Sequence, residues 1–171
     1  MRICVLIAAK NEAIAIGSTI DSIVSAGVDK KHLYLVSDGS SDNTALLGMG
    51  RGIQVLDVPV NGGKSLAIAK GIKHFDLASY DLLALTDADT TLEPGYFAAM
   101  ARAFEKFPNA LGLRYWLTAW RALQYAIGHW LIKEGQHALE TINVAAGCCS
   151  VFRMSLFDQI WESRPIASSK T

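Results

Sequence analysis

The sequence predicts an α/β fold, a mainly parallel sheet flanked by helices. Two observations carry this prediction. Short apolar runs alternate with helical stretches four times within residues 1–107, and polar residues follow directly after each apolar run. Strands that alternate with helices form parallel sheets through right-handed crossovers. Such sheets bind ligands beyond the carboxyl ends of their strands, so the four polar segments are expected to converge on one cleft.

Four strands are expected at residues 4–8, 33–36, 53–58 and 82–85. Asn11 is expected to cap the helix after the first strand, and Gly27 to end it. Ser41 or Asp42 can cap the second helix. A third helix is expected at residues 64–74, and Pro94 suits the first turn of a fourth that ends near residue 107. The first helix has an apolar face of Ile16, Ile20, Ile23 and Val24.

The rest of the chain, residues 108–171, differs in pattern. Tryptophan and aliphatic residues recur at helical spacing from Trp116 to Trp130, which predicts one apolar helix face. Packing of this face against the sheet is the commoner explanation, and contact with a membrane surface or self-association is the alternative. A strand at 141–145 and a short helix at 155–161 are also expected.

Composition bounds the class of protein. Sixteen basic and sixteen acidic residues leave no net charge, which argues against a nucleic-acid partner. Three cysteines without a disulfide or metal-binding pattern indicate a reducing compartment. Because the sequence shows no signal peptide and no apolar run long enough to cross a bilayer, we expect a soluble cytoplasmic domain.

Asp87 and Asp89 form the sharpest motif, directly after the fourth expected strand. Two carboxylates so spaced can hold a hard cation such as Mg²⁺ or Mn²⁺ and leave positions open for phosphate oxygens. The metal would offset the charge of a departing diphosphate. The alternative is that Asp87 caps a turn and Asp89 is merely solvated. The other polar strand ends at the same rim favour the metal site.

Three other patterns leave alternatives open. Asp38 can accept a hydrogen bond from a nucleotide base, with Gly39 permitting close approach of the ligand, or the pair is simply a turn. The segment Gly62-Gly63-Lys64-Ser65 suggests a P-loop, but Val58 stands where that motif needs its first glycine. Asp87-x-Asp89 also resembles the nucleophile motif of haloacid-dehalogenase-type phosphatases, although no second acidic pair follows it.

Four motifs, in order and spacing, resemble the family 2 glycosyltransferases with a GT-A fold. The resemblance is closest to the processive, often membrane-anchored branch that includes chitin, hyaluronan and poly-N-acetylglucosamine synthases. The segment from Gly147 to Arg153 also resembles that family's acceptor-side loop. The four motifs are Ala8-Ala9-Lys10-Asn11-Glu12, Ser37-Asp38-Gly39-Ser40-Ser41-Asp42-Asn43-Thr44, Asn61-Gly62-Gly63-Lys64 and Asp87-Ala88-Asp89-Thr90.

The resemblance implies a UDP-sugar donor and inverting transfer to a hydroxyl of a saccharide or lipid-linked acceptor. Asp89 would ligate Mg²⁺ or Mn²⁺ at the diphosphate, and Asp87 would contact the nucleotide. The other donor-binding residues implied are Ala8, Lys10, Asn11, Glu12, Asp38, Gly39, Gly63, Lys64 and Ala88.

The sequence also departs from the pattern of the family that it resembles. Ala9 stands where relatives usually have proline, and the stretch between Asn109 and Trp116 is shorter than in relatives. The family's general base is expected beyond Thr171. We therefore expect one GT-A domain truncated at its acceptor-side end, with a nucleotide-sugar-binding half at 1–107 and a partial acceptor-side half at 108–171. It is either an enzyme inactive in this form or a non-catalytic donor-binding module. A full-length relative would work at the cytoplasmic face of a membrane.

Overall fold

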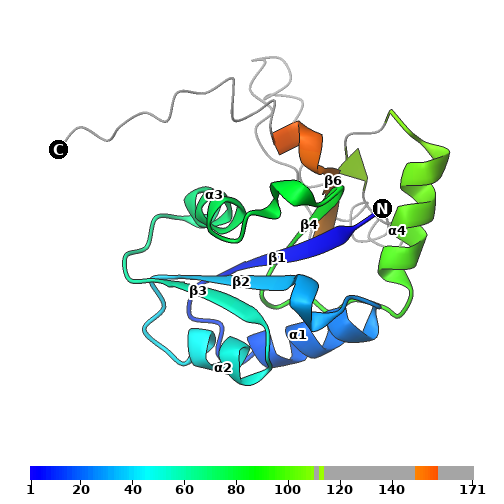
Figure 1. Cartoon of the computed structure of the whole chain (residues 1–171). Coiled ribbons are helices and arrows are strands. Elements are labelled where there is room, and N and C mark those ends of the chain that lie inside the picture. Colours follow the sequence, from blue (N-terminus) through cyan, green and yellow to red (C-terminus); the bar gives the residue numbers. More distant parts are fainter. Residues whose placement is uncertain (110–111, 114–148, 158–171) are drawn as a thin grey trace, which may run out of the picture.

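A computed structural model describes residues 1–109, 112–113 and 149–157, which form a six-stranded sheet (Figure 1). The strand order is β3-β2-β1-β4-β6-β5. Strands β1 to β4 pair in parallel, whereas β6 runs antiparallel to both β4 and β5. The strands are β1 Ile3–Ala9, β2 Leu33–Asp38, β3 Gln54–Val58, β4 Leu82–Thr86, β5 Gly112–Leu113 and β6 Cys149–Arg153.

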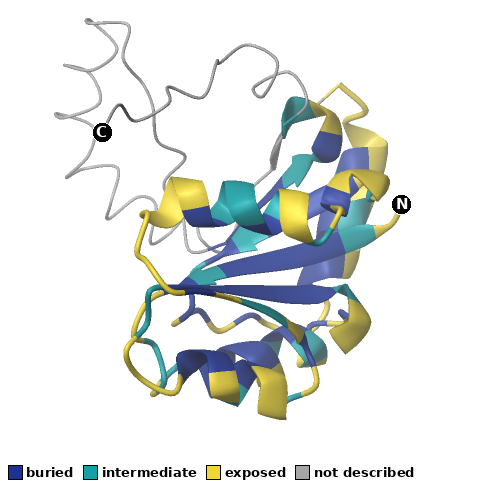
Figure 2. Ribbon diagram, turned by 60° about the vertical axis from the view of Figure 1, so that its left-hand side comes forward, coloured by how far each residue is buried: buried dark blue, intermediate teal, exposed yellow. Residues whose placement is uncertain are grey.

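Helices cover both faces of the sheet, as the alternating pattern predicted. Side chains of α1, α2 and α4 pack in one core cluster, and side chains of α3 and η2 pack in the other. Figure 2 shows the buried strands between these helix layers, whose outer faces are exposed. The helices are α1 Ile16–Ser25, α2 Thr44–Gly50, α3 Lys64–His74 and α4 Tyr96–Lys106, with short 3-10 turns η1 Lys30–His32 and η2 Leu77–Ser79.

Successive residues of β1 divide between the two cores. Val5 and Ile7 face α1 and α4, and Cys4 and Leu6 face α3. A strand buried on both faces is expected to be apolar throughout, which is why its sequence is a continuous apolar run rather than an alternating one. This double burial fixes β1 at the centre of the sheet, between β2 and β4.

Three local predictions need correction. Pro94 lies before α4, whose N-cap is Gly95, and not in the first turn of that helix. Asn11 does not cap α1, which begins at Ile16 with Ala15 as its N-cap; instead Asn11 adopts a left-handed conformation with φ of 57°. The segment that ends at Arg153 is strand β6 from Cys149 on, not a loop. Gly27, with φ of 106°, does follow the end of α1 as predicted, and α3 spans the predicted residues 64–74.

Several expectations lie outside the described residues. They concern Gly147, the Trp116–Trp130 helix with its membrane-surface or self-association role, the strand at 141–145 and the end of the helix predicted at 155–161. Within the described part of the chain, residues 154–157 are helical. No helix among the described residues is both long and apolar enough to span a bilayer.

Candidate functional site

The carboxyl ends of β1, β2, β3 and β4 lie at one edge of the sheet, because these strands are parallel. The chain passes from β1 through β2 to β3 in one direction, whereas β4 lies on the other side of β1. Ligands of open α/β sheets bind where the strand order reverses in this way, here at the ends of β1 and β4. The four motif segments, at 8–12, 37–44, 61–64 and 87–90, lie at this edge.

The loops after β1 and β2 are joined through Asn11. Its side-chain oxygen accepts a hydrogen bond from the Ser41 amide at 2.8 Å, and its own amide donates to Ser40 Oγ at 3.1 Å. The left-handed backbone of Asn11, which asparagine tolerates better than most residues, turns its amide toward this neighbouring loop. Asn11 is therefore a structural link at the rim, and its side chain is already engaged.

Asp42 and Thr44 complete the link between the two loops. Asp42 Oδ2 accepts the Ala13 amide at 3.0 Å, and Thr44 Oγ1 accepts the Glu12 amide at 2.8 Å. The Thr44 hydroxyl donates to Asp42 and holds the pKa of that carboxyl below its usual value, with the Ala13 and Thr44 amides acting in the same direction. The backbone around Glu12 is thus held from both sides.

Asp38 ends β2 and is 97 % buried, since only 3 % of its surface is exposed. Its carboxylate accepts the Gly62 amide at 3.0 Å on Oδ1 and the Gly63 amide at 2.8 Å on Oδ2. The Asn61 side-chain amide donates to Oδ2 and to the Asp38 carbonyl, both at 3.1 Å. The carboxylate therefore holds the loop that precedes α3 by accepting its hydrogen bonds.

Gly39 serves the same loop. Its amide donates to the Val58 carbonyl at 2.7 Å, and its φ of 68° lies in the left-handed region that favours glycine. A Cβ at this position would lie 2.5 Å from the Asn61 amide nitrogen, which no side chain can tolerate. The absence of a side chain at Gly39, predicted to admit a ligand, here admits the backbone of Asn61.

Lys64 and Asp87 form an ion pair across the rim, between the start of α3 and the end of β4. Asp87 is half-buried and Asp89 is exposed. Lys10 and Gly63 are also exposed, and Ala8 and Glu12 are half-buried. The structure thus brings residues expected to bind the donor, from β1, α3 and the end of β4, to one edge, with Lys64 and Asp87 in direct contact.

The turn after β4 is hydrogen-bonded to side chains of α1, a contact that the sequence did not predict. Thr19 Oγ1 donates to the Ala88 carbonyl at 2.7 Å, and Ser22 Oγ accepts the Leu92 amide at 3.2 Å. Thr19 is buried in α1 like Ile16, Ile20 and Ile23, and Ser22 is half-buried. Polar residues beside an apolar helix stripe were the available signal for this contact.

The pair Asp87 and Asp89 fits a divalent cation shared with a phosphate ligand. The described residues contain no cluster of three or more carboxylate, imidazole or thiol groups that could enclose a metal. Mg²⁺ is usually held by one or two carboxylates together with substrate phosphates and water, rather than by a protein cage. The exposed Asp89 carboxylate meets that requirement.

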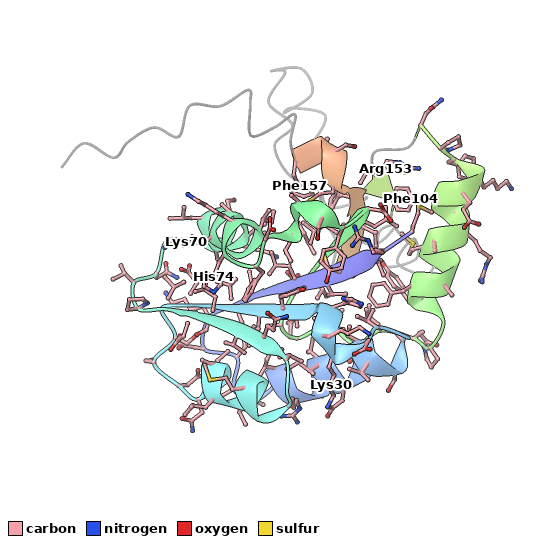
Figure 3. The ribbon with its side chains drawn as sticks, in the orientation of Figure 1. Lys30, Lys70, His74, Phe104, Arg153 and Phe157 are labelled. Atoms are coloured by element: carbon pink, nitrogen blue, oxygen red, sulfur yellow. The ribbon has the colours of Figure 1, made fainter. Side chains whose placement is uncertain are left out.

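Arg153 lies at the far end of the sheet from this rim. It pairs with Leu82, the first residue of β4, whereas Cys149 pairs with Thr86 at the other end. The guanidinium donates to the Phe104 carbonyl at 3.1 Å and lies 5.1 Å from the centre of that ring (Figure 3). Arg153 thus contacts the last turn of α4, and its expected acceptor-side role stays a prediction.

A parallel sheet with charged loops at its switch point defines the class of α/β domains that bind ligands at their strand ends. The chain matches the Glycosyl transferase family 2 model over residues 4–161. It therefore belongs to glycosyl transferase family 2, as the four motifs predicted. The alternatives of a haloacid-dehalogenase-type phosphatase and a P-loop nucleotidase are wrong.

Curated relatives include poly-beta-1,6-N-acetyl-D-glucosamine synthases of staphylococci. The Staphylococcus epidermidis enzyme is 28% identical over 176 residues, which cover 92% of this chain and 41% of that protein. The enzyme of Staphylococcus aureus strain COL is 29% identical over 163 residues, which cover 88% of this chain and 39% of the relative. The chain thus spans about two fifths of the length of these relatives.

Solved structures of similar fold confirm the predicted GT-A architecture. A mannosyltransferase from Pyrobaculum calidifontis, in complex with GDP-Man and Mn²⁺, aligns with a TM-score of 0.65 at 16% identity over 93% of this chain and 46% of that one. Glucosyl-3-phosphoglycerate synthase from Mycobacterium tuberculosis, in complex with Mn²⁺, UDP and phosphoglyceric acid, aligns with a TM-score of 0.62 at 20% identity over 91% and 56%.

Proposed function

We propose that this chain binds the UDP-sugar donor of a family 2 glycosyl transfer, through a divalent cation at Asp89. The observation that carries the proposal is the Lys64–Asp87 ion pair beside the exposed Asp89 carboxylate, at the switch point of the sheet. A cation and two carboxylates so placed can hold a diphosphate together with its metal. UDP and Mn²⁺ complexes of proteins with the same fold support this choice.

The uridine in this proposal lies against the linked loops after β1 and β2. Ala8, Lys10, Asn11 and Glu12 line that part of the rim. Among the described residues, Asp38 Oδ1 takes a single hydrogen bond, from Gly62, while Oδ2 takes three. A carboxylate oxygen offers two lone pairs, so Oδ1 retains the capacity to accept a base N–H.

The diphosphate in this proposal lies between the start of α3 and the turn after β4. When bound, Mg²⁺ or Mn²⁺ would offset the negative charge that develops on UDP as it leaves. Lys64 supplies a positive charge from the opposite side, next to Gly63. Asp87 and Ala88 contact the nucleotide, while the hydrogen bond from Thr19 keeps their turn in place.

The reaction proposed is inverting transfer of a hexosyl or N-acetylhexosaminyl group to a hydroxyl of a saccharide or lipid-linked acceptor. The staphylococcal relatives, named for a polymer of N-acetyl-D-glucosamine, support an N-acetylhexosamine donor. We also propose that the reaction takes place at the cytoplasmic face of a membrane. The second candidate is a donor-binding module without turnover, since no carboxylate of the described residues is assigned as the general base.

Thermal unfolding tests donor binding. A ligand that binds only the folded state at a concentration a hundred times its Kd stabilises the protein by about 2.7 kcal/mol. UDP is therefore expected to raise the Tm when Mg²⁺ or Mn²⁺ is present and to lose that effect in excess EDTA. Asp89→Ala is expected to abolish the metal-dependent shift, whereas Glu105→Ala, which removes an exposed carboxylate from α4, is expected to retain it.

Two results would contradict the proposal: equal stabilisation by UDP with and without metal, or normal metal-dependent binding by the Asp89→Ala variant. Transfer of labelled sugar to short saccharide acceptors separates the two candidates. Transfer in excess of donor hydrolysis identifies an enzyme, and binding without transfer identifies the donor-binding module.

A further inference from the structure

We propose that Asp38 is a positioning residue: it holds Lys64 where the lysine amine can contact the diphosphate of the donor. This role is additional to a hydrogen bond between Asp38 and the nucleotide base. The inference rests on the proposed function and adds a role that the base contact does not require. It starts from the two glycine amides that precede α3. In a P-loop such amides would point at a phosphate, whereas here Gly62 and Gly63 donate theirs to Asp38.

The carboxylate of Asp38 is built into the fold as an internal anion. It lies with 3 % exposure beside the amino end of α3, a helix of 11 residues whose N-cap is Gly63. Negative charge is stabilised near a helix amino end, and hydrogen bonds to a charged acceptor are stronger than neutral ones. Asp38 therefore occupies the position that a bound phosphate would need in order to use these amides.

Asp38 is connected through Gly63 and Lys64 to Asp87 at the end of β4. Gly63 donates to Asp38 at 2.8 Å and is followed directly by Lys64, whose amine pairs with Asp87 at the end of β4. The backbone of Asn61 is packed against Gly39, so this loop has little room to move toward β2. One buried carboxylate on β2 thus sets where the Lys64 amine lies relative to β4.

A prediction about ligands follows from this arrangement. Because the amides of Gly62 and Gly63 are engaged, the diphosphate depends on the Lys64 side chain at this side of the rim. If Asp38 served only to accept a base N–H, its loss would weaken uridine and UDP by the same factor. If it positions Lys64, its loss should weaken UDP far more than uridine.

The experiment is a double-mutant cycle read out with three ligands. Dissociation constants for uridine, UMP and UDP, with Mn²⁺ present, are measured by NMR titration for wild type, Asp38→Ala, Lys64→Met and the double variant. We expect Asp38→Ala to weaken UDP by roughly tenfold more than uridine, and Lys64→Met to have little further effect once Asp38 is gone, because residues in one contact network are not additive. Asp38→Asn, which keeps one acceptor oxygen, should restore part of the UDP affinity.

Asp42→Asn is the matched control, since Asp42 also accepts backbone amides at the rim but joins the β1 and β2 loops. It should leave the ratio of UDP to uridine affinity unchanged. If Asp38→Ala does not fold, Asn61→Ala replaces it in the cycle, because Asn61 donates one hydrogen bond to the same carboxylate. That variant should also weaken UDP more than uridine, by a smaller factor than Asp38→Ala.

Equal losses for uridine and UDP in the Asp38 variant, together with additive effects of Lys64→Met, would overturn the positioning role and leave the base contact. Failure of the wild-type chain to bind UDP at all would instead overturn the proposed function. The two failures are therefore distinguishable in one set of titrations.

Discussion

Thr19 in α1 donates its hydroxyl to the carbonyl of Ala88, 2.7 Å away, in the turn between Asp87 and Asp89. Thr19 is 1 % exposed, so the bond is shielded from water. Helix α1 belongs to one core cluster of the sheet, and the bond ties the turn to that cluster. The turn that carries the two carboxylates of the candidate metal site is therefore bonded to α1.

Loss of that bond is expected to cost stability and metal affinity together. Thr19→Val keeps the side-chain shape but leaves the Ala88 carbonyl without this donor, a change that costs about 1–3 kcal/mol for a buried group. Urea unfolding should show the loss, and the Mn²⁺-dependent Tm shift with UDP should shrink. Ser18→Ala is the control, because the exposed Ser18 hydroxyl donates to the Ala15 carbonyl within its own turn. Equal effects of the two variants would contradict the prediction.

Gly39 and Gly52 form a matched pair that separates backbone strain from steric contact. Their φ angles are 68° and 75°, but a Cβ on Gly39 would meet Asn61, whereas a Cβ on Gly52 would have nothing within 4 Å. Gly52→Ala is expected to cost the left-handed penalty alone, about 1–2 kcal/mol. Gly39→Ala should cost more and should also weaken UDP. Denaturant unfolding of both variants measures the difference, and equal losses would contradict it.

The Asp42 carboxyl should make the free energy of unfolding depend on pH in the acid range. Because the Thr44 hydroxyl lowers the pKa of Asp42 in the folded chain, its contribution to stability is fully present above the unfolded pKa of about 4 and is lost as pH falls through the lower folded pKa. Wild type should therefore lose stability below about pH 4 more steeply than Asp42→Asn. Chemical unfolding between pH 2 and 7 tests this; Asp57→Asn, at an exposed position of β3, should follow wild type. Parallel curves for Asp42→Asn and wild type would contradict the prediction.

Cys4 is expected to be inert in the folded protein. Burial raises the pKa of its thiol to about 12, and the side chain is fully enclosed in β1. Since the thiolate is the reactive form, iodoacetamide at pH 8 should leave the Cys4 peptide unlabelled until the protein is unfolded. Peptide mass spectrometry before and after addition of urea measures this. Rapid labelling of Cys4 under native conditions would show that the centre of the sheet opens.

The sequence predicted the parallel strands and α3 because short apolar runs alternate with helical stretches and are followed by polar residues. β1, β2 and β4 are buried on both faces, whereas the edge strand β3 exposes Gln54 and Asp57. It failed at Asn11, where a capping residue before a helix was expected. The actual partner, Ser41, lies in another loop, so the hydrogen bond depends on the pairing of β1 with β2. β6 was taken for a loop because its antiparallel pairing with β4 joins segments far apart in the chain.

The candidate site shows the same limit. The family motifs located Asp38, Lys64, Asp87 and Asp89 at one rim, since strand ends converge in any parallel sheet. They did not show that Asp38 holds the Asn61–Gly63 loop, because a motif gives the residue type and not its hydrogen-bond partner. Thr19 lay outside every motif, and only its bond to Ala88 connects it with the site.

The central place of β1 has a consequence for how the protein is made. β1 pairs with β2 from Leu33 onward and with β4 from Leu82 onward. During translation the first edge of β1 can be covered early, but the second stays unpaired until the residues of β4 have left the ribosome. An open edge on an apolar strand is a template for aggregation, and long-range pairing is slow. The buried centre of the sheet therefore cannot be completed until β4 has been made, and β4 in turn waits for β6, which begins at Cys149.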